Sequence, residues 1–149
     1  MLPDFVSVNF NEAGSASLAK LLIDKGVGIE AGLFDAAAAE ACVQSGLAAR
    51  CLRILLEPRG ADVATAVRTA DEMIAVLDKA GVSAARVPRL LHGSNATAWG
   101  VIDEAARRGY DTRAGLEDTL TMPDGSTAAD NAAIVAEARR RVERPTRPA

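Results

Sequence analysis

Three charged residues lie close together in the segment from 113 to 118. Arg113 precedes Glu117 by four residues, and Asp118 follows directly. In a β-strand, Arg113 and Glu117 would lie on one face, and Asp118 on the other unless the chain bends there. One carboxylate could bind a metal ion and the other accept a proton, while the guanidinium orients one of them and keeps it ionised. A salt-bridged strand end is an equally simple interpretation of the same residues.

Other polar side chains come at the ends of earlier segments that we predict to be strands. They are Asn9, Glu30, Glu57 and His92. Because parallel strands bind ligands at their carboxyl ends, these side chains would share one rim with the charged segment. A carboxylate can instead cap the next helix, which is our interpretation of Asp35 and Asp62. Glu30 lies inside an apolar run, which favours a functional role, whereas His92 fits a rim contact or a hydrogen-bonded structural histidine equally well.

The elements that must position these residues alternate between strand and helix. Runs rich in β-branched and aromatic residues predict strands, and apolar residues at helical spacing between a capping residue and a glycine predict helices. The predicted strands are 5–10, 27–33, 51–57, 88–93 and 112–118, and the predicted helices are 15–25, 36–44, 62–79, 95–108 and 128–142. Five such units predict a parallel sheet with right-handed crossovers.

Two architectures are built from such units. One is a five-stranded doubly wound sheet, complete in itself. The other is part of a TIM (β/α)8 barrel, which typically needs about 250 residues. The length of 149 residues favours the first, and the polar groups at the strand ends favour the second. We predict the second: an α/β protein with parallel strands that forms a partial TIM barrel over residues 1–143, followed by a disordered basic and proline-containing tail at 144–149.

Composition and missing motifs exclude several function classes. The net charge of −3 gives no nucleic-acid-binding surface, and no segment approaches the roughly 20 apolar residues that span a membrane. The sequence has no signal-peptide pattern and no GxGxxG, GxxxxGK[ST] or GxSxG motif, so nucleotide binding and serine hydrolysis lack their key features. Cys42 and Cys51 lie outside any CxxC or Cys/His cluster and are expected to be reduced thiols in a cytoplasmic protein.

A pattern that covers nearly the whole chain resembles a known family. It comprises Leu90-Leu91-His92-Gly93, Ala96-Thr97-Ala98-Trp99 and the segment 109–120, together with 3–10, 28–33, 53–57 and 129–132. These segments resemble the β-keto acid cleavage enzymes, whose type member is 3-keto-5-aminohexanoate cleavage enzyme. The stretch from Arg113 to Leu120 is the specific part of the resemblance.

The resemblance implies a TIM barrel with one zinc ion. Such an enzyme condenses a β-keto acid with acetyl-CoA and releases an acetoacetate-type product and a new CoA ester. Zinc would polarise the keto group, and a carboxylate base held by arginine would remove the α-proton. The family's catalytic aspartate, activating arginine and zinc-binding glutamate match Asp118, Arg113 and Glu117. Another catalytic glutamate matches Glu30, and the candidate substrate contacts are Asn9, Glu57 and His92.

The sequence departs from the family in its histidines. The family's other zinc ligands are two histidines of an early His-x-His strand, whereas His92 is the only histidine here. The strands resemble the fourth to eighth of the barrel, so we expect the first three units and the histidine pair to be absent from this chain. Because a catalytic zinc usually has three protein ligands, we expect the chain alone to be incomplete.

Several outcomes follow for such an incomplete barrel. Its open strand edges would invite pairing, either with further copies in a homo-oligomer or with a complementing N-terminal fragment. It could also be a remnant without activity. The alternative from a different class is a non-catalytic, flavodoxin-like α/β interaction domain, which would be monomeric and indifferent to zinc.

Overall fold

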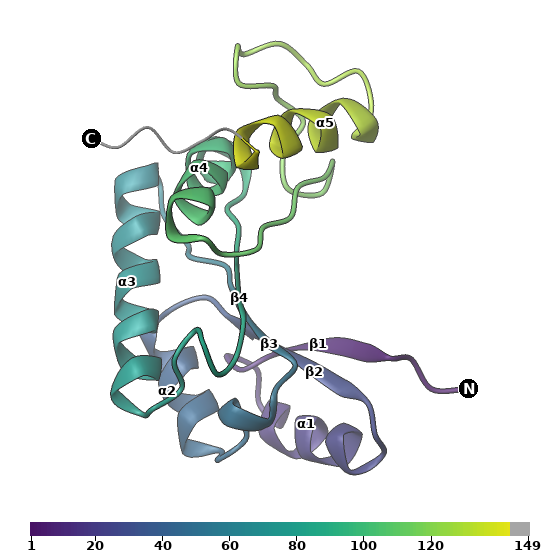
Figure 1. Ribbon diagram of the computed structural model, residues 1–149, viewed down its shortest axis with the longest axis vertical. Coiled ribbons are helices and arrows are strands. Elements are labelled where there is room, and N and C mark those ends of the chain that lie inside the picture. Colours follow the sequence, from purple (N-terminus) through teal and green to yellow (C-terminus); the bar gives the residue numbers. More distant parts are fainter. Residues whose placement is uncertain (144–149) are drawn as a thin grey trace.

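The computed structural model describes residues 1–143, so the predicted tail at 144–149 lies outside the described residues. Within the described part, four parallel strands form one sheet in the order β1-β2-β3-β4 (Figure 1). The strands are β1 (Phe5–Asn9), β2 (Gly28–Leu33), β3 (Arg53–Leu56) and β4 (Arg89–Leu91). The five α-helices of this part are α1 (Ser15–Asp24), α2 (Ala36–Gln44), α3 (Val63–Lys79), α4 (Ala98–Arg108) and α5 (Asn131–Val142). Short 3-10 helices cover Ala48–Arg50 and Asn95–Thr97.

Three of the described α-helices begin at an aspartate whose side chain caps the first turn. The carboxylates of Asp35, Asp62 and Asp130 accept hydrogen bonds from backbone N–H groups in the first turns of α2, α3 and α5, each at 2.8 Å. These bonds satisfy donors that no helical carbonyl can reach. The capping interpretation of Asp35 and Asp62 is therefore confirmed.

The two faces of the sheet carry different residues, as the two-residue period of a strand requires. One face is apolar and packs against the helices through Val8, Ile29, Ala31, Leu33, Ile54, Leu56 and Leu91. The opposite face carries a polar row that the parallel register places side by side across β1, β2 and β3. This row is Ser7, Glu30 and Arg53.

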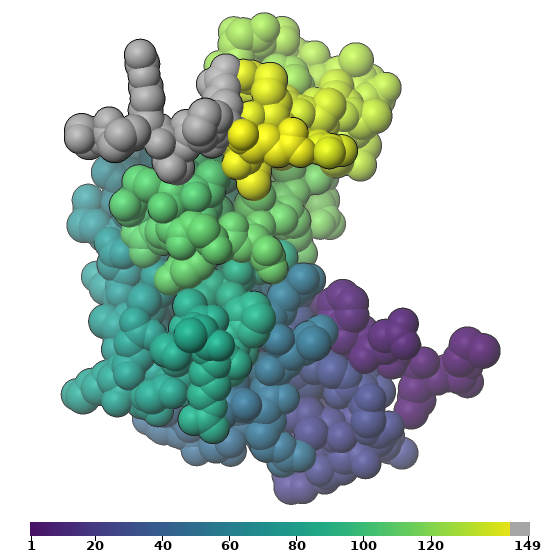
Figure 2. Space-filling model, viewed as in Figure 1, coloured from purple at the N-terminus to yellow at the C-terminus, as the bar shows by residue number. Residues whose placement is uncertain are grey.

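The strand order follows the chain order without a reversal. Right-handed crossovers between sequential parallel strands place every connecting helix on the same face of the sheet. A doubly wound sheet instead reverses its order and has helices on both faces. Figure 1 shows the helices along one side of the curved sheet, and Figure 2 shows the molecule hollowed between its N-terminal strand and its C-terminal third. The arrangement is consistent with an arc of a barrel.

The predicted fifth strand at 112–118 is wrong. Pairing with β4 stops after a single bridge, in which Leu91 N–H donates to the Asp111 carbonyl and Asp111 N–H donates to the Arg89 carbonyl, at 2.9 and 3.0 Å. The Thr112 hydroxyl then donates to the Leu91 carbonyl at 2.8 Å, where a continuing strand would place a backbone N–H. Downstream, the chain closes a turn on the Gly115 carbonyl. Local side-chain bonding therefore replaces the ladder.

The helical segments are short or amphipathic. Among the described residues, none of the helices has the length and apolar character needed to cross a membrane. The longest, α3, alternates a buried stripe formed by Ala66, Ala70, Met73 and Leu77 with exposed charged residues. This is the pattern of a helix that covers a sheet.

Candidate active site

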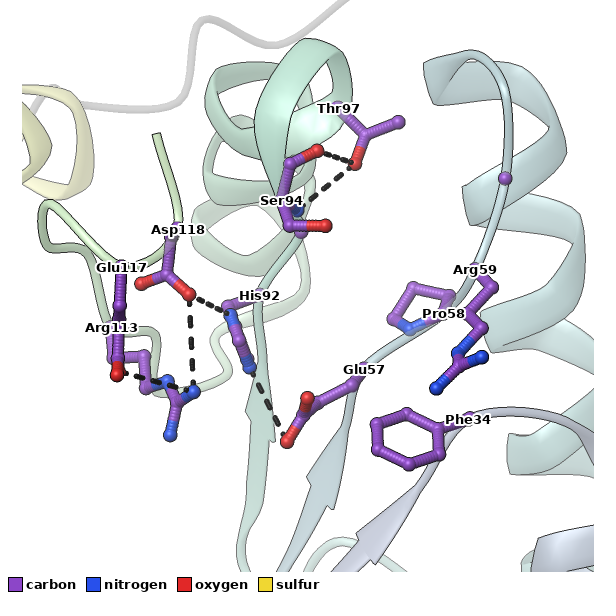
Figure 3. Close-up of a pocket in the computed structure, with 12 residues that line it drawn as sticks. Phe34, Glu57, Pro58, Arg59, His92, Ser94, Thr97, Arg113, Glu117 and Asp118 are labelled. Atoms are coloured by element: carbon purple, nitrogen blue, oxygen red, sulfur yellow. Dashed lines mark hydrogen bonds and ion pairs between the residues drawn. The ribbon is translucent and has the colours of Figure 1, made fainter. Parts of the chain in front are cut away.

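A cavity of about 500 Å³ opens at the carboxyl ends of the strands. Glu57 follows β3 and His92 follows β4, and because Leu56 and Leu91 are register partners, the two side chains emerge at the same level. The loop after α4 supplies the facing charged residues. They are Arg113, Glu117 and Asp118 (Figure 3). The volume is within the range of about 300–1,000 Å³ typical of small-molecule sites.

His92 lies between two carboxylates. Its Nδ1 is 3.3 Å from Oδ1 of Asp118, and its Nε2 is 3.6 Å from Oε1 of Glu57. Only 3% of His92 is exposed, and neither ring nitrogen reaches hydrogen-bond geometry with a partner. Catalytic hydrogen bonds are often this long before a substrate is bound.

The two carboxylates also control the charge of the imidazole. Burial disfavours the protonated form and lowers the pKa of His92, but Asp118 and Glu57 act against burial and outweigh it. The pKa of His92 is consequently raised above its ordinary value. The two carboxylates thus stabilise the imidazolium, whose charge offsets part of the negative charge around it.

A turn brings Asp118 to this site. The N–H groups of Asp118 and Thr119 donate to the Gly115 carbonyl at 3.0 and 3.1 Å, and Leu116 N–H donates to Oδ1 of Asn131 at 3.0 Å. The Asp118 carbonyl in turn accepts from the N–H of Asn95 at 2.6 Å. The bend is therefore tied both to α5 and to the 3-10 helix before α4.

The bend places all three charged residues of the segment together. An Nη of Arg113 is 3.4 Å from Oε1 of Glu117 and 3.9 Å from Oδ1 of Asp118. Asp118 is 6% exposed, whereas the Glu117 side chain is 73% exposed. The buried carboxylate thus faces a guanidinium on one side and the His92 imidazole on the other. These two neighbours can orient the carboxylate.

Glu30 and Asn9, the other predicted site residues, do not line this cavity. Glu30 is buried on the polar face of the sheet, where it accepts a hydrogen bond from Ser7 Oγ at 2.6 Å and pairs with Arg53. Asn9 Nδ2 donates to Oε1 of Glu12 at 3.0 Å. Both residues lie on predicted strands, but the sequence does not show which positions along a strand face the cavity.

Other lining residues were not identified from the sequence. The cavity is also lined by Phe34, Arg59, Ser94 and Thr97. Phe34 and Ser94 come within two residues of the predicted strand ends, and that position was the available signal. Their side chains carry no sequence motif by themselves.

A metal-ion site needs several ligand side chains that converge on one point. Among residues 1–143, no group of three or more His, Cys, Asp or Glu side chains is arranged to hold a metal. Glu117, the predicted zinc ligand, is paired with Arg113. A catalytic zinc usually has three protein ligands, so the described residues do not form a complete zinc site by themselves.

The fold and the site define an α/β protein with a charged small-molecule cavity at the carboxyl ends of its parallel strands. A family model described as beta-keto acid cleavage enzyme matches residues 3–149. The chain therefore belongs to the β-keto acid cleavage enzyme family, and the resemblance inferred from its segments is confirmed. The family is generally metal-dependent and generally uses a β-keto acid and acetyl-CoA. No curated protein matches the chain.

Proposed function

We propose that this chain carries the carboxylate and arginine part of a β-keto acid cleavage site. The reaction would join a β-keto acid to acetyl-CoA and release an acetoacetate-type product and a CoA ester. Family membership supports the reaction class. The observation that carries the assignment is the burial of Asp118 between Arg113 and His92 in a cavity of small-molecule size.

Asp118 is the proposed general base. The α-carbon of a β-keto acid lies between two carbonyl groups, so its protons are acidic enough for a carboxylate to remove. Arg113 and His92 lie 3.9 and 3.3 Å from Oδ1 of Asp118, so both are close enough to position this carboxylate. Arg113 would orient the base, and Glu57 would hold the far nitrogen of the imidazole at 3.6 Å.

The zinc site and the barrel would be completed from outside the described residues. We propose that Glu117 contributes one zinc ligand, because it lies next to Asp118 with its side chain mostly exposed. Further ligands and β/α units would come from another segment or another chain. The open edge of β1 and the single bridge beyond β4 leave room for both.

Proton abstraction can be measured apart from the full reaction. We expect the chain to accelerate deuterium exchange at the α-carbon of acetoacetate above the spontaneous rate in D2O. Asp118→Asn should remove roughly a hundredfold or more of this acceleration, since a positioned general base contributes about 10²–10⁴. Asp124→Asn, on an exposed turn that does not line the cavity, is the matched control and should have no effect. Exchange that is equal in wild type and Asp118→Asn would contradict the assignment.

Metal content and turnover test whether the zinc site needs ligands from outside the described residues. After dialysis against zinc, we expect the chain alone to retain little metal and to show no acetyl-CoA-dependent cleavage. Tight, stoichiometric zinc that Glu117→Gln abolishes would mean that copies of the chain assemble a usable site. Cleavage by the monomeric chain would refute its proposed incompleteness.

A further inference from the structure

Arg59 is the lining cation of the cavity that no carboxylate neutralises. Arg113 pairs with Glu117 and Asp118, and His92 faces Asp118 and Glu57. Within the described residues, Arg59 forms no ion pair with a carboxylate, and its guanidinium lies over the Phe34 ring at 4.5 Å from the centroid. Figure 3 shows this stack across the cavity from Asp118, with His92 and Glu57 between them.

The loop that carries Arg59 is held in place. Pro58 is buried, and its ring fixes one backbone angle just before Arg59. A Cβ atom at Gly60 would lie 2.7 Å from the backbone nitrogen of Ala66, so only glycine allows the loop to approach the start of α3 this closely. The Thr69 hydroxyl also donates to the Arg59 carbonyl at 3.4 Å. The loop that carries Arg59 is therefore anchored, and the guanidinium stacks on the planar ring of Phe34.

The charge of the cavity requires such a cation if the ligand is an anion. The lining contains the three carboxylates of Glu57, Glu117 and Asp118. Against them stand one paired guanidinium and one imidazole, so without Arg59 the lining stays net negative even when His92 is protonated. A carboxylate or phosphate that entered would be repelled. Arg113 also has an unpartnered Nε, but its guanidinium already faces the carboxylates of Glu117 and Asp118. The guanidinium of Arg59 faces no carboxylate of the described residues, and its planar fork suits a bidentate oxyanion.

We propose that Arg59, stacked on Phe34, is the oxyanion-binding residue at the rim of this cavity. The inference rests on the proposed function, in which both substrates are anions. The bound group would be the carboxylate of the β-keto acid or a phosphate of coenzyme A. Arginine stacked on an aromatic ring keeps its N–H edge free, so the stack positions the cation without consuming its donors.

The test is equilibrium binding by calorimetry on the full chain with three separate probes: acetoacetate, coenzyme A and inorganic phosphate. R59Q should weaken at least one of them by roughly tenfold to a hundredfold, because it removes charge-assisted hydrogen bonds. R86Q removes the same charge from an exposed site before β4, at the opposite end of the strands, and should change affinity less than twofold. R59K keeps the charge but loses the planar fork, and should fall between R59Q and wild type.

The probes separate the two sources of the oxyanion. Loss of acetoacetate binding alone assigns Arg59 to the keto acid carboxylate, and loss of coenzyme A binding alone assigns it to a phosphate. Arg59-dependent binding of inorganic phosphate, with neither substrate bound, would support the site and contradict the proposed function. Equal affinities in wild type and R59Q would overturn the inference while leaving the proposed function standing. Failure of wild type to bind any probe would overturn both.

Discussion

At the scale of the residue, the site is organised around one buried imidazole. His92 faces Asp118 through one nitrogen and Glu57 through the other. A neutral imidazole can donate from only one nitrogen, whereas the protonated ring donates from both. The two carboxylates therefore stabilise the charged ring and raise the pKa of His92. In the sequence, a rim contact and a structural histidine were equally good interpretations of His92, and its position between two cavity carboxylates favours the first.

His92 is the only histidine of the chain, so its titration can be followed by NMR without assignment. We expect a pKa above the ordinary 6.5. Asp118→Asn and Glu57→Gln should each lower it, because each removes a carboxylate that stabilises the imidazolium. Asp103→Asn, on the exposed side of α4, is the control. A wild-type pKa at or below the ordinary value would contradict this electrostatic account.

The same pKa shift makes stability depend on pH. The folded state binds the proton more tightly than the unfolded state, so the contribution of His92 is fully present below the unfolded pKa of about 6.5. It declines as pH rises above that value and is lost once pH has passed through the raised folded pKa. Urea unfolding across this window should show the decline in wild type, and His92→Gln should flatten it.

At the scale of the element, the decisive feature is segment 112–118, which does not form the predicted strand. The alternation of strands and helices along the sequence predicts a fifth strand at 112–118. The structure instead uses the Thr112 hydroxyl to occupy the Leu91 carbonyl and then closes a turn on Gly115. A strand would have separated Asp118 from Arg113, whereas the turn unites them.

Thr112→Val tests how much this replacement contributes. The substitution keeps the shape of the side chain but removes its donor, so we expect the free energy of unfolding to fall by about 0.5–1.5 kcal/mol, the usual net contribution of one hydrogen bond. Thr112→Ser keeps the hydroxyl and should lose less. Chemical denaturation measures both. Unchanged stability in Thr112→Val would mean that water or a backbone N–H satisfies the Leu91 carbonyl equally well.

At the scale of the whole molecule, the four-stranded sheet of the described residues has an unpaired edge at β1, a single bridge beyond β4, and a polar row on one face. Phe5 begins the edge strand β1 and is 42% exposed, and apolar residues of α5 such as Val135 are also exposed. Parallel strands usually occur in sheets that are covered on both faces and closed or protected at their edges. These features support the proposal that the chain associates with further β/α units.

Association should be visible by light scattering as a mass that grows with protein concentration. Phe5→Lys should reduce it, because an edge lysine opposes strand pairing. Leu18→Lys makes the same change at a comparably exposed position, 49%, on α1 and away from the edge, and should have little effect. A constant monomeric mass in all three proteins would favour the flavodoxin-like interaction domain. The strand order of this chain, β1-β2-β3-β4, is nevertheless not that of a doubly wound fold.

The sequence by itself determined the local structure and the family. Helix caps such as Asp35 and Asp62 depend on only a few neighbouring residues, and so does the hydrophobic periodicity of strands and helices. The first four strands and the five described α-helices could therefore be predicted. The specific run from Arg113 to Leu120 identified the family that the chain belongs to.

Only the tertiary structure decided which residues meet. The turn at Gly115 is fixed by contacts of Leu116 with Asn131 and of Asp118 with Asn95, which are distant in sequence. The register of the sheet placed Glu57 beside His92 and left Glu30 among Ser7 and Arg53. Local propensity cannot encode such choices, because their energy comes from hydrogen bonds and packing that exist only after the chain has folded.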